Sequence, residues 1–256
     1  MPIFFVEYSI HKRKVNMKII ISPAKRFKHF EDIATSPLIY PEKTKDLVGR
    51  IKKLSINELG NLNQTNDQLT EKAYFDFHDF DFEDLGNPAL FSYDGLVFKQ
   101  FSYDDFEDLS YLNDHVYVIS ALYGPLKPFT GIRDYRLYFD NKMINLYDFW
   151  KDDIYREIFK DKDLVLNLAS KEYSKTIKPY LKEGDEFVTV DFKDEKNGKF
   201  RSIVSWTKQM RGKMLKEIIT RKIARLDEVK KLEIDGYVYD SYKSTGSNLV
   251  FVRRKS

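Results

Sequence analysis

Thirteen lysine or arginine residues stand against five aspartate or glutamate residues between Lys193 and Lys231, whereas the whole chain carries a net charge of only +3. Clustered guanidinium and ammonium groups bind phosphates, and the side chains of Phe200 and Trp206 in the same segment are of the type that stacks on bases. The segment therefore predicts a surface for a polyanion. The alternative is that these charges cover the solvent faces of ordinary helices.

A hairpin and a helix are predicted to present these charges. The pair Asn197-Gly198 is typical of a tight hairpin because both residues accept a positive φ. A helix is predicted from about Lys208 to Leu226, and their spacing of three places Lys208 and Arg211 on one side of it. The predicted polyanion contacts are Lys196, Lys199, Arg201, Lys208, Arg211 and Lys213.

Three predicted strands end in polar or basic residues, at 22–25, 120–127 and 167–170. Ligands of open parallel sheets bind at the carboxyl ends of strands, so these ends are expected to line one cleft. Helices beginning at Ser22 and Ser170 would offer N–H groups to an anion, and Lys25 would complete a phosphate pocket, although helix capping alone also explains both serines.

The predicted hairpin carries more charge than its turn requires. Asp194, Lys196 and Lys199 flank the turn, and a lysine beside carboxylates is suited to acid–base chemistry or to phosphate binding. We therefore expect the hairpin to join the cleft at the strand ends. The residues expected around one concave pocket are Lys25, Asn167, Ser170, Asp194 and Lys196.

The segment from Asp76 to Asp114 has the opposite charge, with eleven acidic residues and the single cation Lys99. Most of these acids are expected to face water, and the aromatic residues between them to enter the core. The acidic segment also leaves open a structural or interaction protein that docks a partner through this face.

The order of these elements predicts a mixed α/β fold. Continuous apolar runs at Lys18–Ile21, Val116–Ser120 and Asp163–Leu168 are typical of buried parallel strands. Four later segments alternate more and are expected to add antiparallel strands: Phe187–Phe192, Phe200–Trp206, Tyr237–Tyr239 and Leu249–Val252. Without a linker or an internal repeat, residues 17–256 are expected to form a single compact domain, a mixed sheet flanked by helices with a basic cleft.

Composition excludes several classes of function. The chain has no cysteine, which rules out disulfides, thiolate catalysis and cysteine-bound zinc, and its four histidines are not paired. No nucleotide-binding glycine fingerprint is present. No metal and no cofactor are therefore expected, with an all-carboxylate Mg²⁺ site in the 76–114 segment as the alternative. No apolar run approaches the length of a membrane span, so we expect a cytoplasmic protein without membrane contact. The sequence does not specify the oligomeric state, and a monomer is favoured.

Residues 1–16 are expected to be an extension upstream of the native start. The segment from Ile10 to Asn16 is polar and basic, and Met17 opens the first predicted strand. A weaker alternative makes the extension a basic arm that adds to polyanion binding.

Six short motifs in order give the chain a family resemblance. They are I-S-P-A-K at Ile21–Lys25, L-Y-G-P-L-K-P at Leu122–Pro128, Y-R-L at Tyr135–Leu137, L-Y-x-F-W at Leu146–Trp150, N-L-A-S-x-E-Y at Asn167–Tyr173 and F-x-D-E-K-N-G-K at Phe192–Lys199. Together they resemble the YaaA-type peroxide stress protein family, from Met17 to the C-terminus.

The resemblance implies a cytosolic protein that limits peroxide damage, with one compact fold, a positively charged cleft and affinity for double-stranded or branched DNA. Under this resemblance the six polyanion contacts become DNA contacts. The cleft residues that it implies are Lys25, Tyr135, Arg136, Asn167, Ser170, Asp194, Lys196, Asn197, Lys208 and Arg211.

Two features depart from the family pattern. Tyr138-Phe139 follows Y-R-L where an acidic residue and a methionine are expected. The family is also associated with a helix-hairpin-helix element, whose glycine hairpin is absent from 55–73 and from 213–237, so none is assigned.

The leading hypothesis is a DNA-binding stress protein that acts without catalysis and recognises the DNA backbone rather than base sequence. The rival hypothesis is an enzyme with a charged strand-end pocket, formed by Lys25, Asp194, Lys196 and Arg211, that acts on a nucleic acid or a small anionic substrate. No catalytic motif identifies a reaction.

Overall fold

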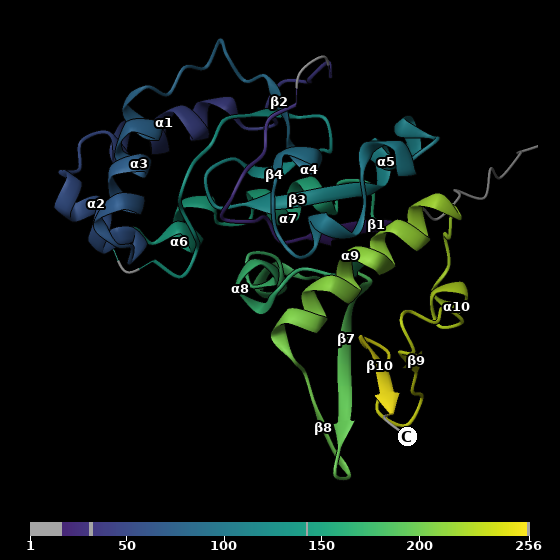
Figure 1. Ribbon diagram of the computed structural model, residues 1–256. Helices are drawn as coiled ribbons and strands as arrows, with labels where there is room; N and C mark the ends of the chain where they lie inside the picture. The colour runs from purple at the N-terminus through teal and green to yellow at the C-terminus, as the bar shows by residue number, and fades with distance from the viewer. Residues whose placement is uncertain (1–16, 31–32, 142, 255–256) are drawn as a thin grey trace, which may run out of the picture.

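The computed structural model describes residues 17–30, 33–141 and 143–254. The expected extension at residues 1–16 lies outside the described residues. Within those ranges every helix is too short or too polar to cross a membrane. The fold is a mixed α/β arrangement in one compact domain, as the sequence predicted, with helices around a central sheet (Figure 1).

The main sheet has eight strands in the order β4-β3-β1-β6-β7-β10-β9, with β8 paired to β7. Its five parallel strands are β1 (Met17–Ile21), β3 (Val116–Ser120), β6 (Leu164–Asn167), β7 (Phe187–Lys196) and β10 (Asn248–Arg254). The antiparallel strands are β4 (Gly124–Leu126), β8 (Lys199–Arg201) and β9 (Val238–Tyr239). A two-stranded sheet pairs β2 (Asn87–Pro88) with β5 (Gly131–Ile132).

Strand β1 lies at the centre of the parallel region, paired with β3 on one side and β6 on the other. All five of its residues are buried, which explains its continuous apolar run, since helices cover both faces of parallel sheets. Its one charge, Lys18, is buried with its Nζ atom 2.8 Å from the Asp161 carboxylate. The apolar side chains of this strand and of its neighbours are buried together and form the hydrophobic core.

Ten α-helices and three 3₁₀ turns surround the sheet within the described residues. The α-helices are α1 (Pro41–Ile51), α2 (Ile56–Asn63), α3 (Asp67–His78), α4 (Ala89–Ser92), α5 (Leu109–His115), α6 (Leu146–Trp150), α7 (Asp153–Ile158), α8 (Lys171–Ser174), α9 (Val204–Thr220) and α10 (Leu226–Val229). The 3₁₀ turns are η1 (Phe98–Gln100), η2 (Tyr103–Asp105) and η3 (Lys178–Tyr180).

Helices α2 and α3 pack against each other as a helical hairpin. Ser55 begins α2 with a capping box, in which the Glu58 N–H donates to Ser55 Oγ and the Ser55 N–H donates to the Glu58 carboxylate. The residue that ends α2 in the left-handed conformation is Gln64, with φ of 48°, where a glycine is usual. The turn therefore carries no glycine signal in the sequence.

Several expected elements differ from the structure. Strand β7 is parallel to β6 and strand β10 is parallel to β7, because long excursions of the chain separate the two strands of each pair. Residues 204–206 begin helix α9 instead of extending a strand, since β8 ends at Arg201. No helix follows Ser22, and the helix expected after Ser170 stops at Ser174.

Strands β7 and β8 form a projecting arm, which here means residues 193–201 (Figure 1). Its tip is the predicted turn, with φ of 53° at Asn197 and 72° at Gly198. Strand β6 ends beside Thr189, whereas β7 continues to Lys196. The arm therefore extends well beyond the edge at which the neighbouring parallel strands end.

Candidate functional site

The carboxyl ends of β1 and β6 lie side by side because the two strands are parallel and paired, with Ile20 opposite Asn167. A hydrogen bond joins the loops that follow them, since the Ser170 N–H donates to Ser22 Oγ over 2.8 Å. Ser22 therefore fixes the neighbouring loop instead of capping a helix of its own. Ligands of open α/β sheets bind at such an edge.

A cavity of about 340 Å³ opens at this edge, and we call it the strand-end cavity. Its lining comes from four segments of chain, together with helix α9. The lining residues are Ser22, Pro23, Ala24, Lys25, Arg26, Asp94, Gly95, Leu96, Val97, Phe98, Tyr135, Arg136, Leu137, Tyr138, Leu168, Ser170, Glu172, Tyr173, Lys208 and Arg211. Five cationic side chains thus surround one space together with two carboxylates.

Helix α9 reaches the cavity because Gly212 allows a close approach. A Cβ atom at this position would lie 2.1 Å from the backbone oxygen of Val97, so only glycine lets the helix pack against this segment. Lys208 lies one turn before Gly212 and Arg211 directly before it, and both line the cavity, which confirms that Lys208 and Arg211 share one side of the helix.

The cationic side chains of helix α9, and of Lys222 just after it, fall into two groups, those with an ion pair and those without one. Lys213 pairs with Asp235, Lys216 with Asp105 at 2.8 Å, and Lys222 with Asp108 at 2.6 Å. Within the described part of the chain, by contrast, no ion pair involves Lys208 or Arg211. The acidic segment between residues 76 and 114 thus neutralises part of the basic one, and the cations at the cavity keep their charge available.

Arg211 is largely withdrawn from water. Its Nε atom is buried without a hydrogen-bond partner in the described chain, and burial lowers the pKa of its guanidinium, opposed by Asp191. Arg211 also lines a second cavity of about 330 Å³, together with Asn167, Lys171, Lys178, Thr189 and others. A buried guanidinium between two cavities is well placed to receive an anion.

Lys25, Arg136 and Tyr138 form another part of the lining. The Lys25 ammonium lies over the Tyr138 ring, 4.4 Å from its centroid, and Arg136 donates to the Lys25 carbonyl oxygen at 3.5 Å. No ion pair of Lys25 or Arg136 occurs among the residues that the structure describes. These two cations add to the positive charge of Lys208 and Arg211.

Glu172 brings a carboxyl group into the same cavity. Its Oε1 atom accepts a hydrogen bond from the Phe139 N–H at 3.0 Å. Phe139 is one of the two residues that depart from the family pattern, and its backbone orients the Glu172 carboxyl. Burial raises the pKa of Glu172, the nearby Asp140 adds to the rise, and Lys25 opposes it. Protonation of this carboxyl would make the cavity more positive.

Tyr135 lines the cavity, but its hydroxyl belongs to a buried network. It lies 2.9 Å from the Tyr93 hydroxyl and 2.8 Å from Ser120 Oγ, and burial raises the pKa of Tyr135 to about 12. Ser120 Oγ also accepts from the backbone N–H groups of Leu122 and Tyr123. The network fixes the end of β3 and leaves Tyr135 a structural role.

The structure divides the expected cleft residues. Lys25, Tyr135, Arg136, Ser170, Lys208 and Arg211 line the strand-end cavity. Asn167 lines the second cavity instead, where its side chain donates to Thr189 Oγ1 and accepts from the Ala169 N–H. The strand-end cavity lacks Asp194, Lys196 and Asn197, which lie on the arm.

The expectation that Asp194 shares the pocket of Lys25 is therefore wrong. Asp194 lies five residues beyond Thr189 along β7, which is roughly 17 Å at about 3.3 Å per residue. Its carboxylate is buried, and it accepts from the Arg253 guanidinium at 2.7 and 2.9 Å and from the Tyr237 hydroxyl at 2.7 Å. These contacts fix the base of the arm, whereas Lys196, Lys199 and Arg201 are exposed along it.

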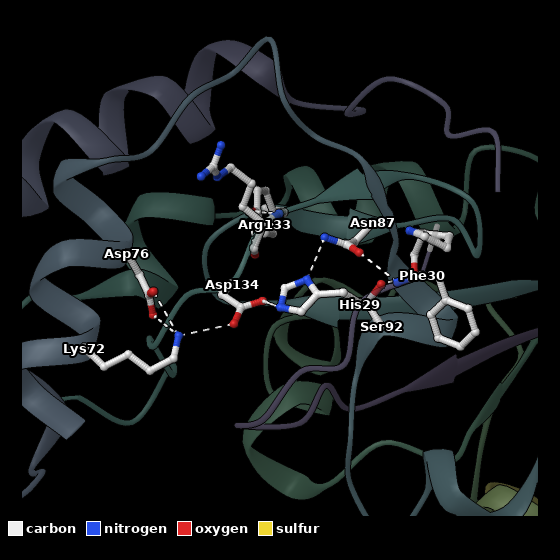
Figure 2. A network of polar contacts seen from close by, with 10 residues as sticks. His29, Phe30, Lys72, Asp76, Asn87, Ser92, Arg133 and Asp134 are labelled. Carbon is white, nitrogen blue, oxygen red and sulfur yellow. Dashed lines mark hydrogen bonds and ion pairs between the residues drawn. The ribbon is translucent and has the colours of Figure 1, made fainter. Parts of the chain in front are cut away.

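A polar hollow of similar volume elsewhere has a different charge balance, and we call it the paired hollow. It measures about 340 Å³ and is lined by His29, Lys72, Asp76, Asp84, Asn87, Arg133 and Asp134. Figure 2 shows Lys72 between Asp76 and Asp134, at 2.8 and 3.2 Å. Arg133 pairs with Asp84 at 2.8 Å. Lysine and arginine charges here are matched by carboxylates.

Within the described ranges, no three histidine or acidic side chains lie close enough together to hold a metal ion. The strand-end cavity and the paired hollow therefore both lack the ligand set of a metal site.

Sequence reasoning missed Glu172, Asp94, Arg26 and Tyr138 as lining residues. Glu172 had a usable signal, because it lies five residues after the end of β6, within the N-L-A-S-x-E-Y motif. Asp94 and Arg26 had none, since their contact depends on packing between distant segments.

Comparison with known proteins gives a consistent result. Residues 17–243 match the sequence family described as peroxide stress protein YaaA. A UPF0246 protein of Clostridioides difficile (strain 630) is 35% identical over 246 residues, which cover 93% of this chain and 100% of that protein. A UPF0246 protein of Ligilactobacillus salivarius is 38% identical over 247 residues, with 93% and 100% covered.

Proposed function

Because the chain belongs to the family of the peroxide stress protein YaaA, which supports a role in peroxide stress, we propose that it acts there by binding duplex or branched DNA. The proposed surface comprises the cations of the strand-end cavity and those of the arm. They are Lys25, Arg136, Lys208 and Arg211 in the cavity, and Lys196, Lys199 and Arg201 on the arm.

One observation carries the proposal: these seven cations take part in no ion pair within the described chain, whereas Lys213, Lys216 and Lys222 all do. An unpaired cation on a folded protein repels its neighbours, and a bound phosphate removes that repulsion. Lys213 was expected among the DNA contacts, but its ion pair with Asp235 removes it from the proposed set.

The chemistry of such a surface is electrostatic. Each phosphate that a cation neutralises releases counterions, so the logarithm of affinity falls with the logarithm of salt by about 0.9 per contact. Contacts of this kind position a protein on the backbone without reading bases. We therefore expect steep salt dependence and similar affinity for unrelated duplexes.

The test compares two double variants that remove the same charge from the same region of the chain. Lys208→Ala with Arg211→Ala removes unpaired cations, and we expect roughly ten- to hundredfold weaker duplex binding with a smaller salt slope. Lys216→Ala with Lys222→Ala removes paired cations and is the matched control, with affinity expected to change by less than about twofold.

Gel-shift titrations on two unrelated duplexes at two salt concentrations measure both effects. Equal loss in the two double variants would contradict the proposal, because it would mean that total charge alone matters. Circular dichroism melts of each variant separate lost binding from lost folding.

A second candidate function is an enzyme that acts on a nucleic acid or a small anionic substrate in the same cavity. The observation that favours it is Glu172, a carboxyl of raised pKa among cations in the cavity. Glu172→Gln would then abolish conversion of the bound substrate without weakening DNA binding. DNA recovered unchanged after long incubation with the wild-type protein would count against the nucleic-acid form of this candidate.

A further inference from the structure

The strand-end cavity has an apolar floor that contact with a DNA backbone does not explain. Val97, Phe98, Leu137 and Leu168 line it and are 8%, 3%, 3% and 1% exposed, and Ala24 lies beside them. Phosphates and sugars on the outside of a duplex require cations and hydrogen-bond donors, not an apolar pocket. An occupant that fills this space needs an apolar part in addition to its negative charge.

The rim of the cavity adds an aromatic face. Tyr138 is half-buried and its ring is covered by the Lys25 ammonium at 4.4 Å. A planar ring that stacked on Tyr138 would displace this exposed lysine and free its charge for the anionic part of the same ligand. Stacking of a base on an aromatic side chain contributes about 1–3 kcal/mol.

Size and charge limit the ligand further. A volume of about 340 Å³ lies at the lower end of the range of small-molecule sites, roughly 300–1,000 Å³, so the cavity suits one nucleotide and not a longer segment. Lys208 and the buried guanidinium of Arg211 supply the cations for one phosphate. Glu172 and Ser170 supply polar groups for the edge of a base.

We propose that the strand-end cavity binds a single unstacked nucleotide, with its base on Tyr138 and the apolar floor and its phosphate on Lys208 and Arg211. This inference rests on the proposed binding of DNA but goes beyond it, because a fully paired duplex holds its bases inside the stack. The nucleotide has two sources, a free mononucleotide or an unpaired nucleotide of a DNA strand. Extruding a paired base costs a few kcal/mol, and an unpaired base avoids most of that cost.

The first experiment titrates the full chain with deoxyadenosine monophosphate, with inorganic phosphate and with deoxyadenosine, by calorimetry. We expect the mononucleotide to bind with a Kd on the order of 1 mM or below, and each part alone to bind at least about tenfold more weakly. Inorganic phosphate that binds as tightly as the mononucleotide would overturn the proposal, because the floor would then contribute nothing.

A variant that fills the cavity separates this site from the DNA surface. Leu96 lines the cavity and is 39% exposed, so Leu96→Trp adds bulk there without changing any charge. The matched control is Ile56→Trp, at an exposed apolar residue of α2 that is 41% exposed. We expect Leu96→Trp to weaken mononucleotide binding roughly tenfold and to leave affinity for a fully paired duplex within about twofold.

A third arm identifies the source of the nucleotide. It compares a fully paired duplex with the same duplex carrying one unpaired adenine. Tighter binding of the second duplex, lost in Leu96→Trp, assigns the site to the DNA strand, and equal binding with intact mononucleotide binding assigns it to a free nucleotide. If the mononucleotide does not bind and the unpaired adenine gives no advantage, the inference is wrong even where duplex binding itself persists.

Discussion

The strand-end cavity and the paired hollow have similar volumes but opposite uses of charge. In the paired hollow, Lys72 lies between two carboxylates (Figure 2). Arg133 pairs with a third, that of Asp84. In the cavity, Lys208 and Arg211 have no carboxylate partner in the described chain. Charges that cancel within the protein hold its segments together, whereas charges that do not cancel remain available to a ligand.

The largest effect is expected at the base of the arm, where Asp194 and Arg253 form a buried ion pair. Asp194→Ala removes the partner of both Arg253 and Tyr237 and leaves a partly buried guanidinium without a counter-charge. We expect the free energy of unfolding to fall by about 3 kcal/mol. Urea denaturation measures it. Unchanged stability together with lost DNA binding would instead place Asp194 in the functional surface.

Gly212→Ala tests how the cavity acquires its unpaired cations. The added Cβ atom would meet the Val97 carbonyl oxygen at 2.1 Å, so the helix must move away from the cavity. Overpacking of this kind costs about 1–3 kcal/mol, and we expect weaker DNA binding in addition. Thermal melts and gel shifts measure the two effects. Gly49→Ala, on α1 with open space around its Cβ position, is the control: we expect it to raise stability by up to about 1 kcal/mol and to leave DNA binding unchanged.

Single lysine variants compare the two hollows directly. Lys72→Met and Lys208→Met each remove one exposed ammonium group, but only Lys72 has carboxylate partners. We expect Lys72→Met to lower the free energy of unfolding by up to about 1 kcal/mol without affecting DNA affinity. Lys208→Met is expected to weaken DNA binding severalfold at unchanged stability. The opposite result, in which Lys72→Met weakens DNA binding and Lys208→Met lowers the free energy of unfolding, would contradict the comparison.

The smallest effect concerns pH. Because burial raises the pKa of Glu172, this carboxyl takes up its proton in the interval above the ordinary value of 4.5 as pH falls. Loss of its negative charge makes the cavity more positive, so we expect anion affinity to rise roughly two- to fivefold as pH falls through that interval. In Glu172→Gln this part of the pH dependence disappears. Isothermal titrations of the mononucleotide at several pH values check the direction.

Local patterns in the sequence were sufficient for much of the fold. The run at Lys18–Ile21 predicted a buried strand, and this prediction is confirmed. The turn at Asn197-Gly198 is confirmed as well. Each of these features depends on residues within a few positions of one another. Strand direction was not accessible in this way, because β7 and β10 pair in parallel across long excursions of the chain.

The sequence by itself determined where the buried parallel strands β1, β3 and β6 form, and that the segment from Lys193 to Lys231 is basic. Only the tertiary structure decided which of its charges remain unpaired. Lys216 lies 111 residues from Asp105 in the chain, yet the two form an ion pair, while Lys208, on the same helix, faces a cavity. Charge pairing depends on distances that packing sets, because the Coulomb energy of two groups follows their separation in space and not in sequence.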